Sequence, residues 1–531
     1  RWSSWPIHAA NCVTPPLLNI GFNDVGFHGC NEIRTPNIDV LAYTGLILHN
    51  YYVTPICTPS RSAIMTGKYP IHTGMQHTVI FGAEPRGLPL EEKILPQYLK
   101  DLGYKTHLVG KWHLGSFKKE YLPLNRGFDS HLGFWTGKID MYDHTNMEKG
   151  TWGHDFRRGF KRADDLFGQY ATDVYTKEAV KLIESHNKSE PMFLMVSHSA
   201  VHSGNPGEPL RAPDKLIANF SDIQDFQRRK YTAMLAKMDE SVGKVVQALA
   251  RQSMLENSMI VFSTDNGGPA AGFNENAASN YPLRGVKNTV WEGGVRGAGL
   301  LWSPKLTARP RVATQKFDLV DWLPTLYRLA GGDVSVFKNI DGMDLWEQLY
   351  EDVKSNRTSV VHNIDNFDSE WNSAAITVGH WKLVSGTNYL GAWDGWYGPS
   401  CRDGSYKYEF LYKSDAAAAI KTITKVPSKD QIKVIRDAAT VYCNDSIPEV
   451  KCKPLVAPCL YNIDEDPCER QNLADSFPNV LQTMLAELER VNRTTVPPNN
   501  VPLNPLGDPK YWGRVFVNFG DLLPSKPTCD N

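Results

Sequence analysis

The sequence predicts an α/β protein with a large, mostly parallel sheet flanked by helices, followed by a smaller C-terminal domain with an antiparallel sheet. Between about residues 100 and 330, apolar runs alternate with amphipathic segments, which is typical of parallel strands joined by helices. After about residue 375 the composition changes, and Gly, Tyr, Trp, Lys and most of the cysteines crowd into shorter segments. We therefore divide the chain into domains at residues 1–375 and 376–531.

Three strands of the large sheet are predicted by apolar runs that end in polar residues. The runs cover residues 106–110, 191–197 and 258–263. The polar residues that follow them are Lys111, His113, His198, His202, Asp265 and Asn266. Because ligands of open α/β sheets lie beyond the carboxyl ends of the strands, these side chains predict a shared site at one edge of the sheet.

A long amphipathic helix is predicted between about residues 225 and 250. Its apolar residues fall on one face at intervals of three and four: Tyr231, Met234, Leu235, Met238, Val242, Val245 and Leu249. We interpret this face, methionines included, as core packing rather than a ligand site. A second helix is expected near residues 478–491, in the C-terminal domain.

The composition excludes several classes of protein. The 531 residues carry 57 Lys and Arg against 58 Asp and Glu, so there is no basic excess of the kind that binds nucleic acid or an anionic membrane. With 14 Trp, 22 Tyr and 21 Phe, the chain has too many aromatic residues for disorder. No run approaches the roughly 18 consecutive apolar residues of a membrane span. We expect a globular protein.

Cysteines and glycosylation sequons indicate the secretory pathway, either the lysosome or secretion. Six of the nine cysteines lie beyond residue 400, and the chain starts at Arg1, which we take as the start of a processed chain. Sequons that predict N-glycans occur at Asn187, Asn219, Asn356, Asn444 and Asn492. The alternative is that these sequons occur by chance in a cytosolic protein. Because nine is odd, one thiol is expected to stay unpaired.

Residues 57–67 predict a short helix that begins with a cysteine. Pro59 lies in the first turn, where its missing N–H costs little, and Gly67 is placed to end the helix. Cys57 would then lie at the positive end of the helix, where a thiolate or a bound anion is stabilised. Helix context alone favours a structural half-cystine at this position.

The residue order around Cys57 resembles the signature of the type I sulfatases. Cys57-Thr-Pro-Ser-Arg61, followed by Thr-Gly67, is similar to the segment whose cysteine is oxidised to formylglycine in that family. Further similar segments begin at Gly110, Ser263, Pro282, Trp291, Asp321 and Leu460. Through residues 23–29 and the stretch around Cys57, the chain looks most like the arylsulfatase B group, the N-acetylgalactosamine-4-sulfatases. The resemblance implies an alkaline-phosphatase-like fold.

The resemblance also implies a nucleophile and a metal ion. One hydroxyl of hydrated formylglycine, derived from Cys57, would attack sulfur, and the second would later expel sulfate. Asp265 would accept the proton of the attacking hydroxyl. Together, Asp265, Asn266 and the modified Cys57 would hold a Ca²⁺ ion that neutralises the sulfate.

Five basic residues would complete the site that the resemblance implies. Arg61 and Lys111 would fix the hydroxyls and the developing charge. His113 would act as the base in the elimination step. His202 and Lys287 would contact the sulfate and protonate the leaving oxygen. The implied partners are a sulfated aryl or glycan substrate of the galactosamine 4-sulfate type and, during maturation, the enzyme that generates formylglycine.

One segment departs from the family pattern. The family opens with a strand that ends in paired aspartates, two of the Ca²⁺ ligands, and the equivalent residues here are Leu18 and Asn19. Leucine cannot ligate a metal, and Pro15 and Pro16 stand where a central strand should run. Three explanations are open: an inactive sulfatase-fold protein that binds sulfated glycans, an enzyme with altered metal binding, or an error in this stretch of sequence. Another hydrolase of the alkaline-phosphatase-like superfamily is a further alternative.

Conversion of Cys57 would account for the odd number of cysteines. Eight thiols would remain, enough for up to four disulfides. They are Cys12, Cys30, Cys401, Cys443, Cys452, Cys459, Cys468 and Cys529. Their pairing is not predicted by the sequence.

Overall fold

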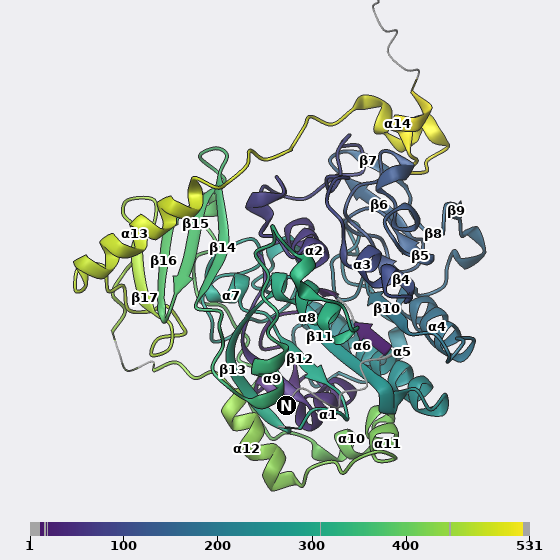
Figure 1. Cartoon of the computed structure of the whole chain (residues 1–531), viewed down its shortest axis with the longest axis horizontal. Coiled ribbons are helices and arrows are strands. Elements are labelled where there is room, and N and C mark those ends of the chain that lie inside the picture. The colour runs from purple at the N-terminus through teal and green to yellow at the C-terminus, as the bar shows by residue number, and fades with distance from the viewer. Residues whose placement is uncertain are drawn as a thin grey trace, which may run out of the picture.

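The computed structural model describes residues 11–14, 17–18, 20–307, 309–444, 446 and 448–523. A large sheet forms the centre of the molecule, with strand order β13-β3-β12-β11-β1-β10-β4-β5-β8-β9 and with β2 paired to β11 (Figure 1). Its strands are β1 (Asn11–Thr14), β2 (Leu17–Leu18), β3 (Leu46–Tyr52), β4 (Lys105–Lys111), β5 (Ser130–Phe134), β8 (Arg157–Arg158), β9 (Lys161–Arg162), β10 (Met192–Ser197), β11 (Ser258–Thr264), β12 (Gly299–Trp302) and β13 (Arg311–Asp318).

The large sheet is mostly parallel, as the sequence predicts. Six of its ten strand pairs in the described part of the chain are parallel, and β12 runs antiparallel to both of its neighbours. The three predicted strands correspond to β4, β10 and β11. These strands share one direction, because β1 pairs in parallel with β10 and β11, and β10 with β4. Their carboxyl ends therefore meet at one edge.

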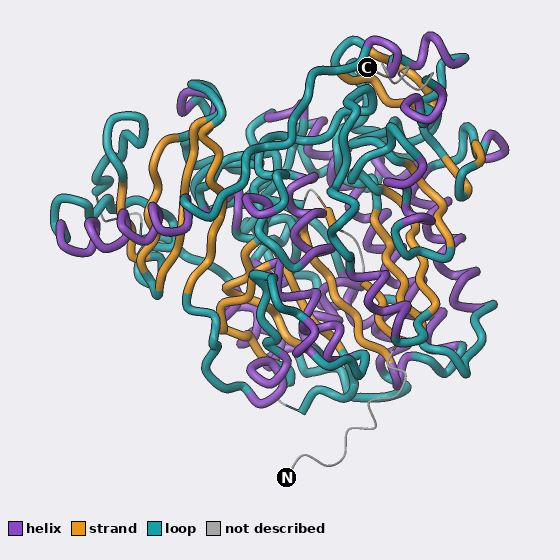
Figure 2. Tube along the Cα trace, turned by 45° about the horizontal axis from the view of Figure 1, so that its top comes forward, coloured by secondary structure: helices purple, strands orange, loops and turns teal. Residues whose placement is uncertain are grey.

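Helices cover both faces of the large sheet (Figure 2). One face packs against α1 (Pro36–Thr44), α4 (Ala171–Glu184), α5 (Asp214–Ala218), α6 (Phe226–Arg251), α10 (Tyr408–Lys413), α11 (Asp415–Ile420) and α12 (Lys429–Ala439). The other face packs against α2 (Cys57–Thr66), α3 (Leu95–Asp101), α8 (Trp322–Leu329) and α9 (Trp346–Glu351). The α/β fold class predicted from the sequence is confirmed.

Strand β10 shows why the central strands are continuous apolar runs. Leu194 and Val196 belong to the core on the α6 side, whereas Phe193 and Met195 belong to the core on the α2 side. Side chains alternate between the faces of a strand, so a strand covered on both faces must be apolar at every position. The run therefore lacks the alternation of a strand with one solvated face.

The predicted long helix is α6, and its apolar face is core. Tyr231, Met234, Leu235 and Met238 are fully buried on the sheet side. Asp225 caps the helix by accepting a hydrogen bond from the backbone N–H of Arg228 at 2.9 Å. Among the described residues, none of the helices combines the length and the apolar character that a membrane span requires.

A second, antiparallel sheet follows the large one. It consists of β14 (Ser359–Asn366), β15 (Asn372–Val378), β16 (Trp381–Gly386) and β17 (Cys459–Asn462). Helix α13 (Pro478–Asn492) lies along this sheet, and its Met484 packs against Ile376 and Leu383 (Figure 1). The predicted helix near residues 478–491 is confirmed. Residue 375 lies inside β15, and the division of the chain at that residue stays a prediction.

The C-terminal segment returns from α13 to the main body of the molecule. In Figure 1 it runs, in yellow, from α13 to α14 (Phe519–Leu522) beside the hairpin of β6 (Thr145–Glu148) and β7 (Thr151–His154). On the way its backbone N–H groups donate hydrogen bonds to carbonyls of an earlier loop: Val496 to Ile71, Asn499 to Gly74 and Asn504 to Ala83. The segment is therefore held across the residues that follow α2.

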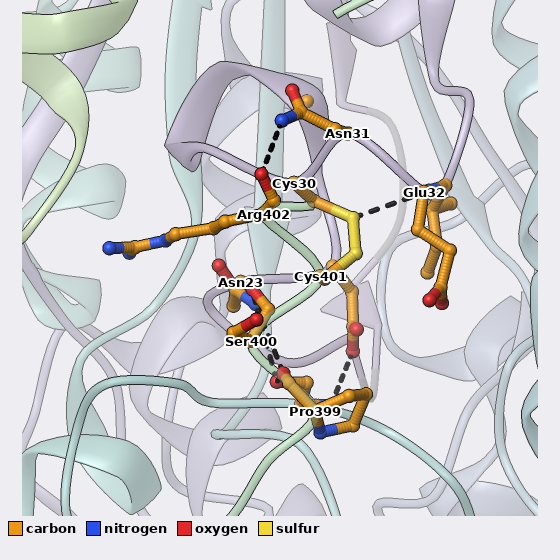
Figure 3. The surroundings of a disulfide bond; sticks show 12 residues. Asn23, Cys30, Asn31, Glu32, Pro399, Ser400, Cys401 and Arg402 are labelled. Carbon is orange, nitrogen blue, oxygen red and sulfur yellow. Dashed lines mark hydrogen bonds between the residues drawn. A yellow bond between two sulfur atoms is a disulfide. The ribbon is translucent and has the colours of Figure 1, made fainter. Parts of the chain in front are cut away.

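Three disulfides form within the described residues: Cys30–Cys401, Cys443–Cys468 and Cys452–Cys459. Figure 3 shows Cys30–Cys401, which joins an N-terminal loop to a segment far along the chain. Next to it, the side-chain amide of Asn31 donates to the carbonyl of Arg402 at 2.8 Å. The predicted use of disulfides is confirmed.

Two cysteines in the described part of the chain form no disulfide, Cys12 and Cys57, and both are buried. Cys12 lies in β1 at the centre of the large sheet, where burial raises the pKa of its thiol to about 12. Cys529 lies outside the described residues, as do Pro15, Pro16 and Asn19. The predicted fourth bridge therefore stays a prediction.

Candidate active site

Polar side chains from the ends of β4, β10 and β11 gather around the first residue of α2. A cavity of about 1050 Å³ opens there, and Cys57, His113, His202 and Lys287 line it. The carboxyl ends of the three strands lie at this edge of the sheet, which is where ligands of such sheets bind. The structure brings one predicted residue from the end of each strand, His113, His202 and Asn266, to the surroundings of Cys57.

Helix α2 places Cys57 at the cavity. The helix begins at Cys57 after the extended residue Ile56 and ends at Thr66, and the residue that follows it, Gly67, has φ 66°. Gly67 is suited to this left-handed position because it has no Cβ. The hydroxyl of Ser60 donates a hydrogen bond to the backbone carbonyl of Asp265 and so fixes the first turn of α2 to the end of β11.

Lys287 and Asn266 contact the sulfur of Cys57. The Nζ of Lys287 lies 3.3 Å from Cys57 Sγ and 3.3 Å from His202 Nε2, and Cys57 Sγ lies 3.7 Å from Asn266 Oδ1. The backbone N–H of Lys287 donates to the carbonyl of Gly268 at 3.1 Å, so the loop that carries the lysine is attached to the turn after β11. These contacts unite predicted residues from three separate segments.

Lys111 and Arg61 bring two further positive charges to the site. One terminal nitrogen of Arg61 donates to the carbonyl of Lys111 at 2.8 Å. The Nζ of Lys111 is buried and has no hydrogen-bond partner among the described residues. A buried ammonium without a partner is costly, so this position favours an anion that accepts its hydrogen bonds.

Backbone carbonyls orient the two histidines. His202 Nδ1 lies 2.7 Å from the carbonyl of Ser203, so Nδ1 carries the proton and Nε2, beside Lys287, is left as an acceptor. His113 Nε2 lies 3.0 Å from the carbonyl of Ile80, which leaves Nδ1 as the acceptor nitrogen. His113 also has φ 61°, an uncommon conformation for a residue other than glycine.

Asp265 and Asn266 provide oxygen atoms directly after β11. Both carboxylate oxygens of Asp265 are buried and lack a hydrogen-bond partner among the described residues. The amide of Asn266 donates to the carbonyl of Gly267 at 2.7 Å, so its Oδ1 is the atom on the side of Cys57. An unsatisfied buried carboxylate is rare in a folded protein and marks a place where a cation or a proton is expected.

The ionisation of Cys57 and Asp265 follows from their neighbours. Burial opposes the thiolate of Cys57, but the charges of Lys111 and Lys287 outweigh burial, and the pKa of Cys57 falls well below its usual value. Burial and the nearby Cys57 raise the pKa of Asp265 to about 6 against the opposing effect of Lys111 and Arg61. The site is built to stabilise negative charge at position 57.

Burial lowers the pKa of several basic side chains of the site. It lowers the pKa of His113 to about 3 and that of His202 to about 4, so both rings are neutral at neutral pH. It lowers the pKa of Lys111 to about 8, although Cys57 and Asp265 oppose the shift. Lys111 therefore keeps its charge below about pH 8.

The segment that departs from the family pattern reaches the same edge of the sheet. Strand β2 pairs with β11 so that Leu18 lies beside Thr264, the residue before Asp265. Asn19 lies outside the described residues. The carboxylate of Asp24, five residues after Asn19, is engaged in other contacts. It accepts hydrogen bonds from Arg228 at 2.7 Å and from Tyr231 at 2.6 Å. Within the described ranges, no three His, Cys, Asp or Glu side chains come close enough to hold a metal ion.

His198 does not join the site, although it follows β10. It is buried and packs against the ring of Tyr175, with 5.7 Å between the ring centroids. Conversely, sequence reasoning missed the cavity walls at residues 77–79, 370–371 and 500–503. These segments carry no motif, and only the tertiary fold brings them to the site.

Comparisons with known proteins show similarity to sulfatases. A family model described as Sulfatase matches residues 19–332. Mouse Arylsulfatase J is 37% identical over 514 residues, which cover 93% of this chain and 78% of that protein. Human N-acetylgalactosamine-6-sulfatase is 30% identical over 352 residues, which cover 63% of this chain and 64% of that protein.

Solved structures share the fold. The crystal structure of Ps i-CgsB in complex with k-i-k-neocarrahexaose superposes with a TM-score of 0.71 at 25% identity, and the match covers 93% of this chain and 94% of that one. The PsFucS1 sulfatase from Pseudoalteromonas sp. superposes with a TM-score of 0.65 at 22% identity, covering 94% of this chain and 92% of that one. The likeness to the PsFucS1 sulfatase shows a shared fold and nothing more.

Proposed function

The chain belongs to the sulfatase family, with the alkaline-phosphatase-like fold of these sulfatases, and we propose that it hydrolyses sulfate esters of sugars by means of formylglycine at position 57 and a bound Ca²⁺ ion. Membership of the family makes it a sulfuric ester hydrolase. The observation that carries the finer proposal is a buried Cys57 at the cavity that forms no disulfide among the described residues, with Lys287 Nζ 3.3 Å from its sulfur.

Cys57 fits the requirements of a formylglycine precursor. It forms no disulfide within the part of the chain that the structure describes, it begins a helix, and it lines the cavity. Its segment keeps Pro59 and Arg61, the residues that the maturation enzyme would read. In its hydrated form, formylglycine supplies a hydroxyl nucleophile for attack on sulfur. The lysines around position 57 favour the anionic form of such a group, as they favour the thiolate here.

Three cations would hold the sulfate. Lys111, Lys287 and Arg61 are each almost fully buried, so their charges act in a medium of low dielectric. The Nζ of Lys111, which has no hydrogen-bond partner among the described residues, would donate to a sulfate oxygen, while Arg61 is fixed by its hydrogen bond to the carbonyl of Lys111. Preorganised donors of this kind stabilise charge that develops in the transition state.

Protons would move through His202 and His113. His202 Nε2 faces the ammonium of Lys287 at 3.3 Å, so this pair can hold a proton close to the leaving oxygen of the ester. His113 is neutral at neutral pH, and its Nδ1 can accept a proton from the group at position 57. Backbone carbonyls fix both ring orientations, which keeps each acceptor nitrogen available.

The residues after β11 fit a hard cation. The two unsatisfied carboxylate oxygens of Asp265 and the Oδ1 of Asn266 are ligands of the type that Ca²⁺ binds. When bound, Ca²⁺ would neutralise charge on the sulfate. Leu18 stands where the family has a carboxylate, so we expect weaker Ca²⁺ binding than in a site with both aspartates.

Calcium titration tests this expectation. Protein treated with a chelator should lose activity and regain it only at a higher Ca²⁺ concentration than a sulfatase with both aspartates needs. Leu18→Asp should lower that concentration. Activity that is indifferent to the chelator would contradict a Ca²⁺ requirement.

We assign the substrate to the galactosamine 4-sulfate type. The sequence resemblance to the N-acetylgalactosamine-4-sulfatase group supports position 4, and the cavity is large enough for a sugar. Hydrolysis of N-acetylgalactosamine 4-sulfate and of its 6-sulfate isomer should be compared by sulfate release. Faster release from the 4-sulfate is expected. Preference for the 6-sulfate would overturn the positional assignment, and release from neither would contradict the sugar substrate.

The described surface is compatible with a glycoprotein of the secretory pathway, lysosomal or secreted. Asn187, Asn219, Asn356 and Asn444 are exposed, and Asn492 is partly buried. Three disulfides within the described residues are consistent with an oxidising compartment. Formation of formylglycine would occur in the same compartment. Removal of N-glycans with a glycosidase, followed by measurement of the mass shift, tests this assignment.

A further inference from the structure

Part of the cavity lies outside the sulfate-binding cluster and is formed by three distant segments. Residues 77–79 follow α2, residues 370–371 lie in the β14–β15 hairpin of the small sheet, and residues 500–503 belong to the C-terminal segment. Tyr389 lines the same cavity. None of these residues has a place in the chemistry proposed above.

His77 is held in a fixed orientation on this wall. Its Nδ1 lies 2.9 Å from a carboxylate oxygen of Asp365, a residue of β14. Its ring stacks on Phe367, with 4.0 Å between the ring centroids, and meets the edge of Trp371 at 5.4 Å. Since Nδ1 carries the proton shared with Asp365, Nε2 is the atom left for a ligand in the cavity.

Asn500 offers a second hydrogen-bonding group beside His77. Its side-chain nitrogen lies 3.3 Å from the hydroxyl oxygen of Thr78 and donates to it. Its Oδ1 is buried and has no hydrogen-bond partner among the described residues. Thr78 has φ 48°, which is uncommon for a β-branched residue. The loop therefore holds a strained conformation next to an acceptor that none of the described residues satisfies.

Two aromatic rings border the polar pair. The rings of Trp371 and Tyr389 lie 5.2 Å apart, and both residues line the cavity. The hydroxyl of Tyr389 accepts a hydrogen bond from Asn288 at 2.5 Å, and Asn288 directly follows Lys287. The aromatic wall is thereby attached to the loop that carries a sulfate-binding lysine. Apolar ring faces beside a few fixed polar groups are typical of a small-molecule site.

We propose that His77, Trp371, Tyr389 and Asn500 form a subsite for the sugar ring of the substrate, a proposal that rests on the function proposed above. The aromatic wall would cover the apolar face of the ring, while His77 Nε2 and Asn500 Oδ1 would bind its hydroxyl groups. Trp371, Tyr389 and Asn500 carry no charge, and the carboxylate of Asp365 lies 2.9 Å from His77 Nδ1. The wall therefore fits a hydroxylated ring rather than a second anionic group.

The subsite makes a prediction about substrate selectivity. Trp371→Ala and Asn500→Ala should each lower kcat/KM for N-acetylgalactosamine 4-sulfate by about 10-fold, mainly through KM, because each removes a contact to the ring. The same variants should change kcat/KM for 4-nitrophenyl sulfate, which has no sugar, by less than about 2-fold. Leu390→Ala, at an exposed residue beside Tyr389, is the matched control and should change neither value.

Equal losses on both substrates would assign these residues a structural role and overturn the proposal. No loss on either substrate would overturn it as well. His77→Gln, which keeps a hydrogen-bonding group near Nε2, should retain more activity toward the sugar sulfate than His77→Ala. Equal behaviour of the two His77 variants would count against a role in hydrogen bonding.

A binding measurement separates this proposal from the proposed chemistry. In a Cys57→Ala background, which removes the nucleophile, calorimetry with N-acetylgalactosamine 4-sulfate should give a Kd that Trp371→Ala raises by about 10-fold. An unchanged Kd, or no binding of the sugar sulfate to the Cys57→Ala protein, would overturn the subsite. A wild-type protein that binds the sugar sulfate but hydrolyses neither substrate would overturn the proposed function and leave the subsite standing.

Discussion

Lys287 and Lys111 act on Cys57 in different ways. Lys287 contacts the sulfur directly at 3.3 Å, whereas Lys111 contributes its charge from a buried position without a hydrogen-bond partner among the described residues. Burial of such an ammonium costs free energy that a bound anion recovers. The arrangement is therefore better explained by a ligand than by the stability of the protein alone.

Lys111→Ala should lower kcat/KM for a sulfate ester by about 10²- to 10³-fold, because it removes a preorganised donor to the developing charge. Steady-state kinetics with 4-nitrophenyl sulfate measure the effect. Lys105 is the matched control, since it begins the same strand but is exposed and pairs with Glu190 at the surface. Lys105→Ala should have kinetics close to wild type. Similar losses in both variants would show that Lys111 has no special role.

The pH profile should reflect the pKa of Lys111, which burial lowers to about 8. A lysine is charged below its pKa, so kcat/KM should fall as the pH rises through about 8 and the ammonium is lost. Arginine keeps its charge well above this pH. Lys111→Arg should therefore lack this alkaline decline, whatever its maximal rate. The same decline in both proteins would assign it to another group.

At the scale of elements, the short helix α2 positions the chemistry. Cys57 is its first residue, and Gly67, whose φ is 66°, directly follows its last residue. The sequence predicted both ends, because Pro59 and glycine have strong positional preferences. Helix α6 and strands β4, β10 and β11 were equally predictable, since each buries long apolar patterns.

Gly67→Ala should lower the free energy of unfolding by about 1 kcal/mol, because an L-residue is strained in the left-handed conformation. Equilibrium unfolding in urea measures the change. Asparagine adopts this conformation more readily, so Gly67→Asn should cost less. An alanine variant as stable as wild type would contradict the conformation of this turn.

The parts of the cavity that the sequence did not predict are those whose position depends on contacts between residues far apart in the chain. The side chain of Asn500 reaches the cavity only because the C-terminal segment returns across the residues that follow α2. Trp371 lines the cavity from the β14–β15 hairpin of the small sheet. The site residues after β4 and β11 could be predicted because the carboxyl ends of parallel strands meet at one edge of the sheet, where ligands bind. No comparable rule predicts where a long segment that returns to the domain will lie.

At the scale of the whole molecule, a buried ion cluster joins the small sheet to the large domain. The Nζ of Lys382, in β16, lies 2.9 Å from Glu292 and 2.8 Å from Glu469, and all three side chains are fully buried. Glu292 begins α7 (Glu292–Val295), in the segment that follows Lys287. The cluster therefore sets the position of the small sheet, and with it the position of the cavity wall at residues 370–371.

Lys382→Met should lower the free energy of unfolding by about 3–5 kcal/mol, because the buried carboxylates of Glu292 and Glu469 both lose the ammonium of Lys382, which leaves Glu292 with Arg296 at 3.7 Å. Denaturant unfolding gives the value. Arg490→Ala is the control, since it removes an exposed ion pair with Glu487 on α13 and should cost less than about 1 kcal/mol. A Lys382 variant no less stable than the control would show that the cluster does not hold the two parts together.

The central claim is that the group at position 57, derived from Cys57, attacks the sulfate ester. Its most direct test combines the mass of the peptide that contains residue 57 with hydrolysis of 4-nitrophenyl sulfate by the same preparation. We predict formylglycine at position 57, turnover by the wild-type protein and none by Cys57→Ala. Protein that carries formylglycine at position 57, has Ca²⁺ supplied and still hydrolyses neither the aryl sulfate nor a sugar sulfate would contradict the claim.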